Sequence, residues 1–225
     1  TSTAVNSDSS TPTAALAVAL RSTDGNAASL DAQGDITVRA AQVYTESDSN
    51  YTINDAGHTV KFTQGDASLA KPLSAGGQLT INAQTIDQGG VLRAPFGRIT
   101  LNADTITLRD GSETSVSGSG LLVPFGSTVN GSTWTYADAN DTRTDLLSKQ
   151  ITLNTSDTGS VTVGKTAVVD AQGGGDVYAR EFVSGPGGSK DIFTGAAGGA
   201  FAVVPLASAN VTGFAVTDRA ILSAT

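Results

Sequence analysis

Apolar and polar residues alternate over short stretches along most of the chain, and the apolar positions are rich in Val, Ile and Leu. Four segments align without gaps on the pattern G-x-φ-T-φ-x-x-x-x-φ, where φ is Val, Ile or Leu: residues 34–43, 77–86, 97–106 and 159–168. A fifth copy, Gln150-ITLNT, keeps the φ-T-φ-N part. A period of two places the apolar side chains on one face and Thr on the other, whereas a helix needs a period near 3.6. The pattern therefore predicts short β-strands.

The spacing between the copies indicates how these strands are arranged. Gly77 and Gly97 stand 20 residues apart, which is too short for a strand followed by a long helix. A repeat of this length fits one coil of a parallel β-helix, in which equivalent positions of successive coils stack about 4.8 Å apart. We therefore expect an all-β fold, a single parallel β-helix segment of about 20 residues per coil over residues 1–225. An antiparallel β-sandwich is the alternative.

Stacking of the coils brings equivalent residues into rows. The outward position of each copy predicts a row of Thr37, Thr80, Thr100, Thr152 and Thr162. The position two residues later predicts an Asn ladder of Asn82, Asn102 and Asn154. Acidic residues near Gly fall between the copies, where we expect the chain to turn: Asp31, Asp87, Asp110 and Asp170.

Three parts of the chain depart from the repeat. Residues 44–76 and 121–149 break the period, and we expect both to leave the coil as extra-helical insertions. Within the second insertion, Asn130-Gly131 lies between β-prone flanks, which predicts a hairpin. The C-terminal part, residues 180–225, is rich in Gly and less regular.

Composition and charge exclude several classes of partner and site. The net charge of −8, from 13 basic and 21 acidic residues, argues against binding to nucleic acid or to anionic membranes. The absence of Cys excludes disulfides and thiolate metal sites. No stretch approaches the roughly 20 apolar residues that cross a bilayer, so we expect no stable membrane insertion. Since Met is also absent, we expect a processed product or a piece of a longer protein.

The candidate chemistry does not point to an enzyme, a cofactor or a metal. General acid–base cleavage of a glycan needs two carboxyl groups about 5–10 Å apart, whereas the carboxylates here fall mainly at expected turns. His58 is the only histidine, has no G-x-S-x-G nucleophile beside it, and is assigned to a surface loop. Asp138, Asp141 and Asp145 form the densest acidic cluster, either a solvated loop or a catalytic or calcium cluster. Their spacing does not match a calcium-binding loop.

Trp134 and Tyr136 are the aromatic residues of greatest interest, because alternation places them on the same face of the predicted hairpin strand. Exposed aromatic side chains are frequent contacts for sugars and protein partners. Together with Asp138 and Asp141 they form a candidate ligand contact. In the alternative interpretation, Trp134 and Tyr136 fold back and cap the hydrophobic core.

Several stretches resemble filamentous-haemagglutinin-type exoproteins of bacterial two-partner secretion. They are GQLTINAQTIDQGGVLRAPFGRITLNADTITLRDGSETSVSGSGLLVPFG from Gly77, GGGDVYAREFVSGPGGSKDIF (residues 173–193) and FAVVP (residues 201–205). The similarity covers roughly residues 76–205, with residues 1–75 compatible as further coils. The resemblance implies an interior, right-handed β-helix segment of a large secreted protein, exported through an outer-membrane transporter partner. The amino-terminal secretion domain of that family is not recognisable here.

The resemblance gives the function that we expect: a non-enzymatic structural and adhesive shaft segment of a surface adhesin, secreted and held at the bacterial cell surface. Its loops, above all residues 121–149, would contact a host-cell glycan or protein receptor, and neighbouring coils of the parent protein would cover its ends. The alternative is a carbohydrate-binding or carbohydrate-cleaving β-helix module.

Overall fold

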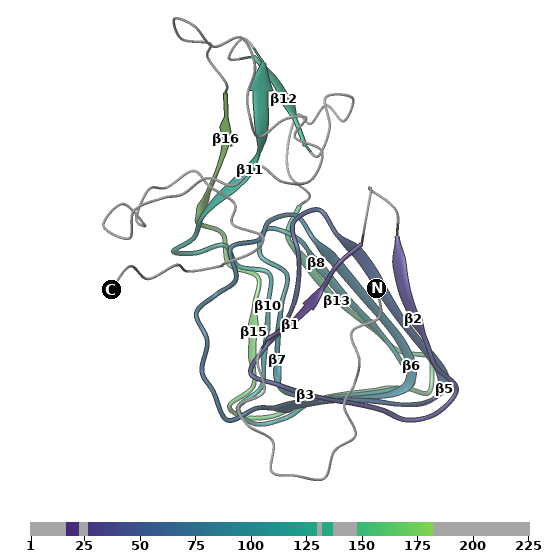
Figure 1. Cartoon of the computed structure of the whole chain (residues 1–225). Coiled ribbons are helices and arrows are strands. Elements are labelled where there is room, and N and C mark those ends of the chain that lie inside the picture. The colour runs from purple at the N-terminus through teal and green to yellow at the C-terminus, as the bar shows by residue number, and fades with distance from the viewer. Residues whose placement is uncertain (1–16, 23–26, 130–131, 137–147, 182–225) are drawn as a thin grey trace, which may run out of the picture. The chain divides into compact units, whose positions relative to one another are not determined.

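The computed structural model describes residues 17–22, 27–129, 132–136 and 148–181, which form β-strands and no helix (Figure 1). The strands are β1 (Val18–Leu20), β2 (Ala28–Asp31), β3 (Ile36–Ala40), β4 (Val43–Thr45), β5 (Asn50–Gln64), β6 (Gln78–Gly89), β7 (Val91–Arg93), β8 (Arg98–Asn102), β9 (Thr105–Leu108), β10 (Glu113–Ser115), β11 (Leu122–Val129), β12 (Thr133–Thr135), β13 (Gln150–Asn154), β14 (Ser160–Val163), β15 (Val168–Asp170) and β16 (Asp176–Arg180). The all-β prediction is confirmed. No helix in this part of the chain is long and apolar enough to cross a membrane.

The chain divides into two compact units. The first comprises residues 1–121 and 146–175, and the second residues 122–145 and 176–225. Sequence analysis treats residues 1–225 as one segment. The division arises because β11 pairs with β12 and β16, and these three strands form a sheet of their own.

The first unit contains two sheets, and every pairing in them is parallel. A five-stranded sheet has the order β1-β4-β7-β10-β15. An eight-stranded sheet has two arms, because its long strands β5 and β6 bend from one arm into the other (Figure 1). The first arm joins β2, β8 and β13 to the first parts of β5 and β6, and the second joins β3, β9 and β14 to their later parts. The prediction of parallel pairing is confirmed for this unit.

The register between strands preserves the sequence repeat. Gln78 pairs with Arg98 and Thr85 with Thr105, so β6 meets β8 and β9 at an offset of 20 residues. Gly97 begins one copy because the backbone passes very close there: a Cβ on it would lie 1.9 Å from the carbonyl oxygen of Gly77.

The register shows that the five Thr residues do not form the single row that the sequence predicts. Thr80, Thr100 and Thr152 are paired neighbours in the first arm. Thr37 pairs with Lys61, and Thr162 with Thr107, all in the second arm. The five copies therefore divide between two arms, because the φ-T-φ pattern reports only that one face of a strand is buried.

The expected insertion at residues 44–76 is smaller than the sequence indicates. Most of β4 and all of β5 fall within this range and pair in the two parallel sheets. The longer stretch outside the strands runs from Gly65 to Gly77, and a short turn at residues 46–49 separates β4 from β5. β4 pairs directly with β7, so this segment adds no strand to the five-stranded sheet. In residues 121–149, β11 and β12 form an antiparallel pair, while Asn130-Gly131 lies outside the described residues. Of residues 180–225, only Arg180 and Glu181 are described.

The core of the first unit is a single apolar cluster that draws on both sheets. The five-stranded sheet contributes Val43 and Leu92. The two arms of the eight-stranded sheet contribute rows of fully buried side chains, with Leu79, Ile81, Ile99 and Leu101 from the first arm and Val60, Phe62, Ile86, Ile106 and Leu108 from the second. The first row consists of φ positions of the repeat, and the second adds Val60, Phe62 and Leu108 to the φ positions Ile86 and Ile106. Burial of these apolar side chains is the main force that holds the arms together.

Candidate functional site

An amide ladder runs along the first arm beside its bend. Asn154 donates from Nδ2 to Oδ1 of Asn102 at 2.8 Å, Asn102 donates to Asn82 at 2.7 Å, and Asn82 donates to Asn54 at 2.7 Å. Asn54 in turn donates to Oδ1 of Asp31 at 2.8 Å. The three Asn residues of the predicted ladder are thus joined by hydrogen bonds. The row of hydrogen bonds continues to Asn54 and Asp31, which the sequence pattern did not assign to the ladder.

A sequence signal for the missing members exists. Tyr51-Thr52-Ile53-Asn54 repeats the φ-T-φ-N part, but Tyr51 takes the first apolar position, which the pattern restricts to Val, Ile or Leu. Asp31 takes the ladder position in β2, and its carboxylate can accept hydrogen bonds but cannot pass them on. A hydrogen bond from Ser29, and next that from Asn54, holds the pKa of Asp31 below its ordinary value. The ladder therefore ends on an ionised carboxylate.

Two hollows lie along this ladder. The first, of about 460 Å³, is lined in part by Asn82, Asn102 and Asn154. The second, of about 630 Å³, is lined in part by Asn54 and Asp31. Both hollows touch Ala56, which lies in an irregularity of β5 between Asp55 and Thr59, where the register with β6 shifts. The ladder and the two hollows are together called the amide groove.

The irregularity in β5 also holds a buried carboxylate. The side chain of Asp55 is fully buried, and its Oδ1 lies 3.2 Å from Nδ1 of His58, whose side chain is 39% exposed and lines the second hollow. The expectation that His58 lies in a surface loop is wrong. His58 lies in β5 because the strand continues through the bend instead of ending before it.

The expectation that acidic residues mark turns holds for Asp110 but fails for Asp31, Asp87 and Asp170, which lie in strands. Asp87 is a member of β6, and its carboxylate accepts hydrogen bonds from Nε and Nη2 of Arg109, the latter at 2.8 Å. Nζ of Lys61 lies 3.5 Å away. The hydrogen bond from Arg109 is the main cause that lowers the pKa of Asp87, and the same pair raises the pKa of Arg109.

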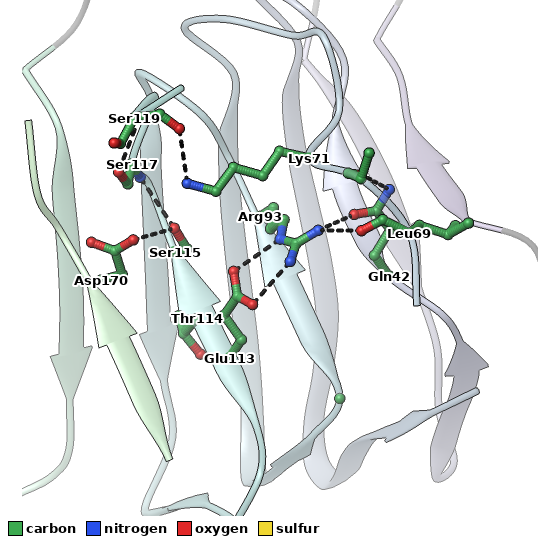
Figure 2. Close-up of polar contacts among 12 residues, drawn as sticks. Gln42, Leu69, Lys71, Arg93, Glu113, Thr114, Ser115, Ser117, Ser119 and Asp170 are labelled. Carbon is green, nitrogen blue, oxygen red and sulfur yellow. Dashed lines mark hydrogen bonds and ion pairs between the residues drawn. The ribbon is translucent and has the colours of Figure 1, made fainter. Parts of the chain in front are cut away.

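The outer face of the five-stranded sheet carries a second polar cluster (Figure 2). Arg93 makes two hydrogen bonds of 2.9 Å to the Glu113 carboxylate, and its Nη1 donates to Gln42 and to the carbonyl oxygen of Leu69. Lys71 donates to the carbonyl oxygen of Ser119 at 3.1 Å. These bonds attach the segment from Gly65 to Gly77 to this face, so the cluster has a structural role.

The candidate ligand contact in the second unit is only partly described. Trp134 donates from Nε1 to the carbonyl oxygen of Phe125 at 2.6 Å, and the Tyr136 ring stacks on the Phe125 ring with centroids 4.3 Å apart. The two aromatic residues therefore pack on β11 of their own unit. Asp138, Asp141 and Asp145 lie outside the described residues.

The described residues offer limited means for catalysis or metal binding. Within residues 17–22, 27–129, 132–136 and 148–181, no group of three or more His, Asp or Glu side chains is arranged to hold a metal ion. Asp104 is the only carboxylate that lines the first hollow and Asp31 the only one that lines the second, counting described residues alone. The arrangement is suited to hydrogen bonding along a groove. No protein-family model, curated protein or solved structure matches this chain.

Proposed function

We propose that the first unit is a right-handed parallel β-helix of about 20 residues per coil, and that it serves as a shaft segment of a large secreted bacterial adhesin of the two-partner type. The parallel pairing of segments one repeat apart supports the β-helix. The preference of parallel crossovers for one hand supports right-handed winding. Export through an outer-membrane transporter and a place at the cell surface are suggested by the family resemblance.

The observation that carries this proposal is the match between identical residues in paired strands. Thr80 pairs with Thr100 and Asn82 with Asn102, and the same residue types recur in β13. Such a repeat transmits load through many backbone hydrogen bonds along one axis, and each coil depends mainly on its neighbours. A shaft needs these properties, whereas a catalytic domain does not.

Attachment in this proposal is the task of segments that do not belong to the repeat. The β11–β12 pair and the residues that follow it, within the range 121–149, interrupt the repeat. The partner would be a host-cell glycan or protein receptor, and neighbouring coils of the parent protein would extend the shaft on either side.

A carbohydrate-active module is the second candidate. The amide groove favours carbohydrate binding, because sugar hydroxyl groups pair well with amides and carboxylates. Cleavage has less support: Asp31 and Asp104 line different hollows, whereas general acid–base cleavage requires two carboxyl groups that flank the same glycosidic bond.

Antibodies against the purified chain test the main proposal on intact bacteria that produce it. We expect the antibodies to label unpermeabilised cells or the culture medium, and to reduce attachment of the cells to epithelial monolayers. Labelling that requires permeabilisation, or unchanged attachment despite surface labelling, would contradict the adhesin role. Antibodies against a cytoplasmic protein of the same bacterium serve as the control for intact envelopes.

A further inference from the structure

We propose that the amide groove binds an uncharged glycan chain along the axis of the first unit. The groove lies at the bend where β5 and β6 pass from the first arm of the eight-stranded sheet to the second (Figure 1). The proposal rests on the proposed function in one respect: both need the parallel register that stacks Asn82, Asn102 and Asn154 at a constant spacing. It assigns a ligand to a surface apart from residues 121–149.

The ladder leaves regularly spaced hydrogen-bonding groups for a ligand. An Asn amide has two N–H donors and two carbonyl lone pairs. Asn82 and Asn102 each use one donor and one lone pair within the ladder, so each keeps one of each kind for a ligand. Paired strands lie about 4.8 Å apart, which is close to the length of one sugar unit in an extended chain.

The ladder also fixes the direction of these groups before a ligand arrives. The amides of Asn82 and Asn102 are each held on both sides by bonds of 2.7–2.8 Å, so oxygen and nitrogen cannot exchange places without breaking the row. A ligand that bonds to oriented groups loses less free energy in ordering them. An array of this kind discriminates ligands by the spacing of their hydroxyl groups.

The floor of the groove suits the apolar faces of sugar rings. Small residues, Ala56, Ala83 and Ala103, line the first hollow together with the ladder amides and Gln84. Ala56 continues the floor into the second hollow. Binding sites for small molecules commonly combine an apolar lining with a few oriented polar groups.

Charge selects an uncharged glycan over a sulfated or uronic one. Each hollow carries one carboxylate, Asp104 in the first and Asp31 in the second, and neither Lys nor Arg lines either hollow among the residues that the structure describes. A carboxylate accepts strong hydrogen bonds from sugar hydroxyl groups and repels sulfate or another carboxylate. His58 is the single group there that could carry positive charge.

The test uses the full chain on an array of neutral oligosaccharides, built from glucose, galactose, mannose, xylose or N-acetylglucosamine, beside sulfated glycans. The best neutral oligosaccharide is then titrated by calorimetry against wild type and three variants. Ala56→Leu fills the place that both hollows share, and Gln84→Leu removes an amide from the wall of the first hollow. Ala70→Leu is the matched control, because Ala70 is exposed and lies outside both hollows.

We expect one class of neutral oligosaccharide to bind, with little dependence on salt concentration. Ala56→Leu and Gln84→Leu should each raise Kd about tenfold or more, and Ala70→Leu should leave it unchanged. Binding of sulfated glycans alone, binding of no glycan, or equal affinity in Ala56→Leu and wild type would each overturn the proposal. The outcome is independent of surface labelling of intact bacteria, so failure of the groove and failure of the adhesin role are distinguishable.

Discussion

Two passes of the chain through the first unit carry the same motif but differ in burial. We call residues 98–115, with β8, β9 and β10, the middle pass, and residues 150–170, with β13, β14 and β15, the last pass. The two passes pair with each other strand by strand, and the middle pass also pairs with β6 and β7 on its other side. The described residues provide no second neighbour for the last pass.

Exposure of paired side chains measures this difference. Leu108 of β9 is 1% exposed, whereas its partner Val163 in β14 is 53% exposed. Ile106 is fully buried, and its partner Val161 is 43% exposed. The sequence motif therefore specifies which face of a strand is apolar, and neighbouring passes determine how far that face is removed from water.

The largest expected difference between the passes concerns Leu101 and Leu153, which are paired. Leu101 is fully buried, and Leu101→Ala should lower the free energy of unfolding by about 2–5 kcal/mol. Leu153 is only half-buried, so Leu153→Ala should cost about 1 kcal/mol. Denaturant unfolding of both variants measures the difference, and equal losses would mean that the last pass is as well covered as the middle one.

A smaller difference is expected within the amide ladder. Asn102→Ala removes a bond to Asn82 and one from Asn154, whereas Asn154→Ala removes only the bond to Asn102. We expect losses of about 1–2 kcal/mol for Asn102→Ala and about half as much for Asn154→Ala. Thermal unfolding at a fixed pH compares them, and Thr152→Ala serves as the control in the same strand. A larger loss for Asn154→Ala would refute cooperative hydrogen bonding along the row.

The sequence predicted the regular part of this unit because its local signals are strong there. Alternating apolar residues at 77–86 and 97–106 identify β6, β8 and β9, and a constant offset of 20 residues identifies their parallel register. The pairing of Asn82 with Asn102 follows from the same offset. Local pattern and tertiary pairing agree in these passes, which is the condition under which sequence reasoning succeeds.

The rest of the fold depends on pairing that no local pattern reports. Thr37 and Thr162 repeat the motif but lie in the second arm, since the motif does not encode which arm a strand joins. Asp55 takes an inward position where Ala83 stands in the next strand, and the irregularity of β5 that accommodates it has no sequence signature. The pairing of β4 with β7 could not be predicted from the sequence either. It requires that the segment from Gly65 to Gly77 adds no strand between them.

The ion pair of Asp87 and Arg109 should make the attachment of the middle pass depend on pH. The folded-state pKa of Asp87 is lowered, so its stabilising effect is fully present above the unfolded value of about 3.9 and is lost as pH falls through the folded value. Asp87→Asn should flatten the fall in stability below about pH 4. Acid unfolding followed by circular dichroism measures this fall, with Asp66→Asn, at an exposed ion pair, as the control. An unchanged acid transition in Asp87→Asn would contradict the assignment.

The smallest effect on stability is expected at the exposed valines of the last pass, where the effect on association is informative. Val161→Lys with Val163→Lys should change the free energy of unfolding by about 0.5 kcal/mol or less, because both residues are already about half exposed to water. Exposed apolar strands with a free edge favour association of chains, and Lys on such an edge prevents it. Sedimentation at rising concentration should show association for wild type and for Leu73→Lys, a control at a 66% exposed site, but not for the double variant. A wild type that stays monomeric throughout would mean that the last pass is covered, and the difference between the passes would then be one of local packing alone.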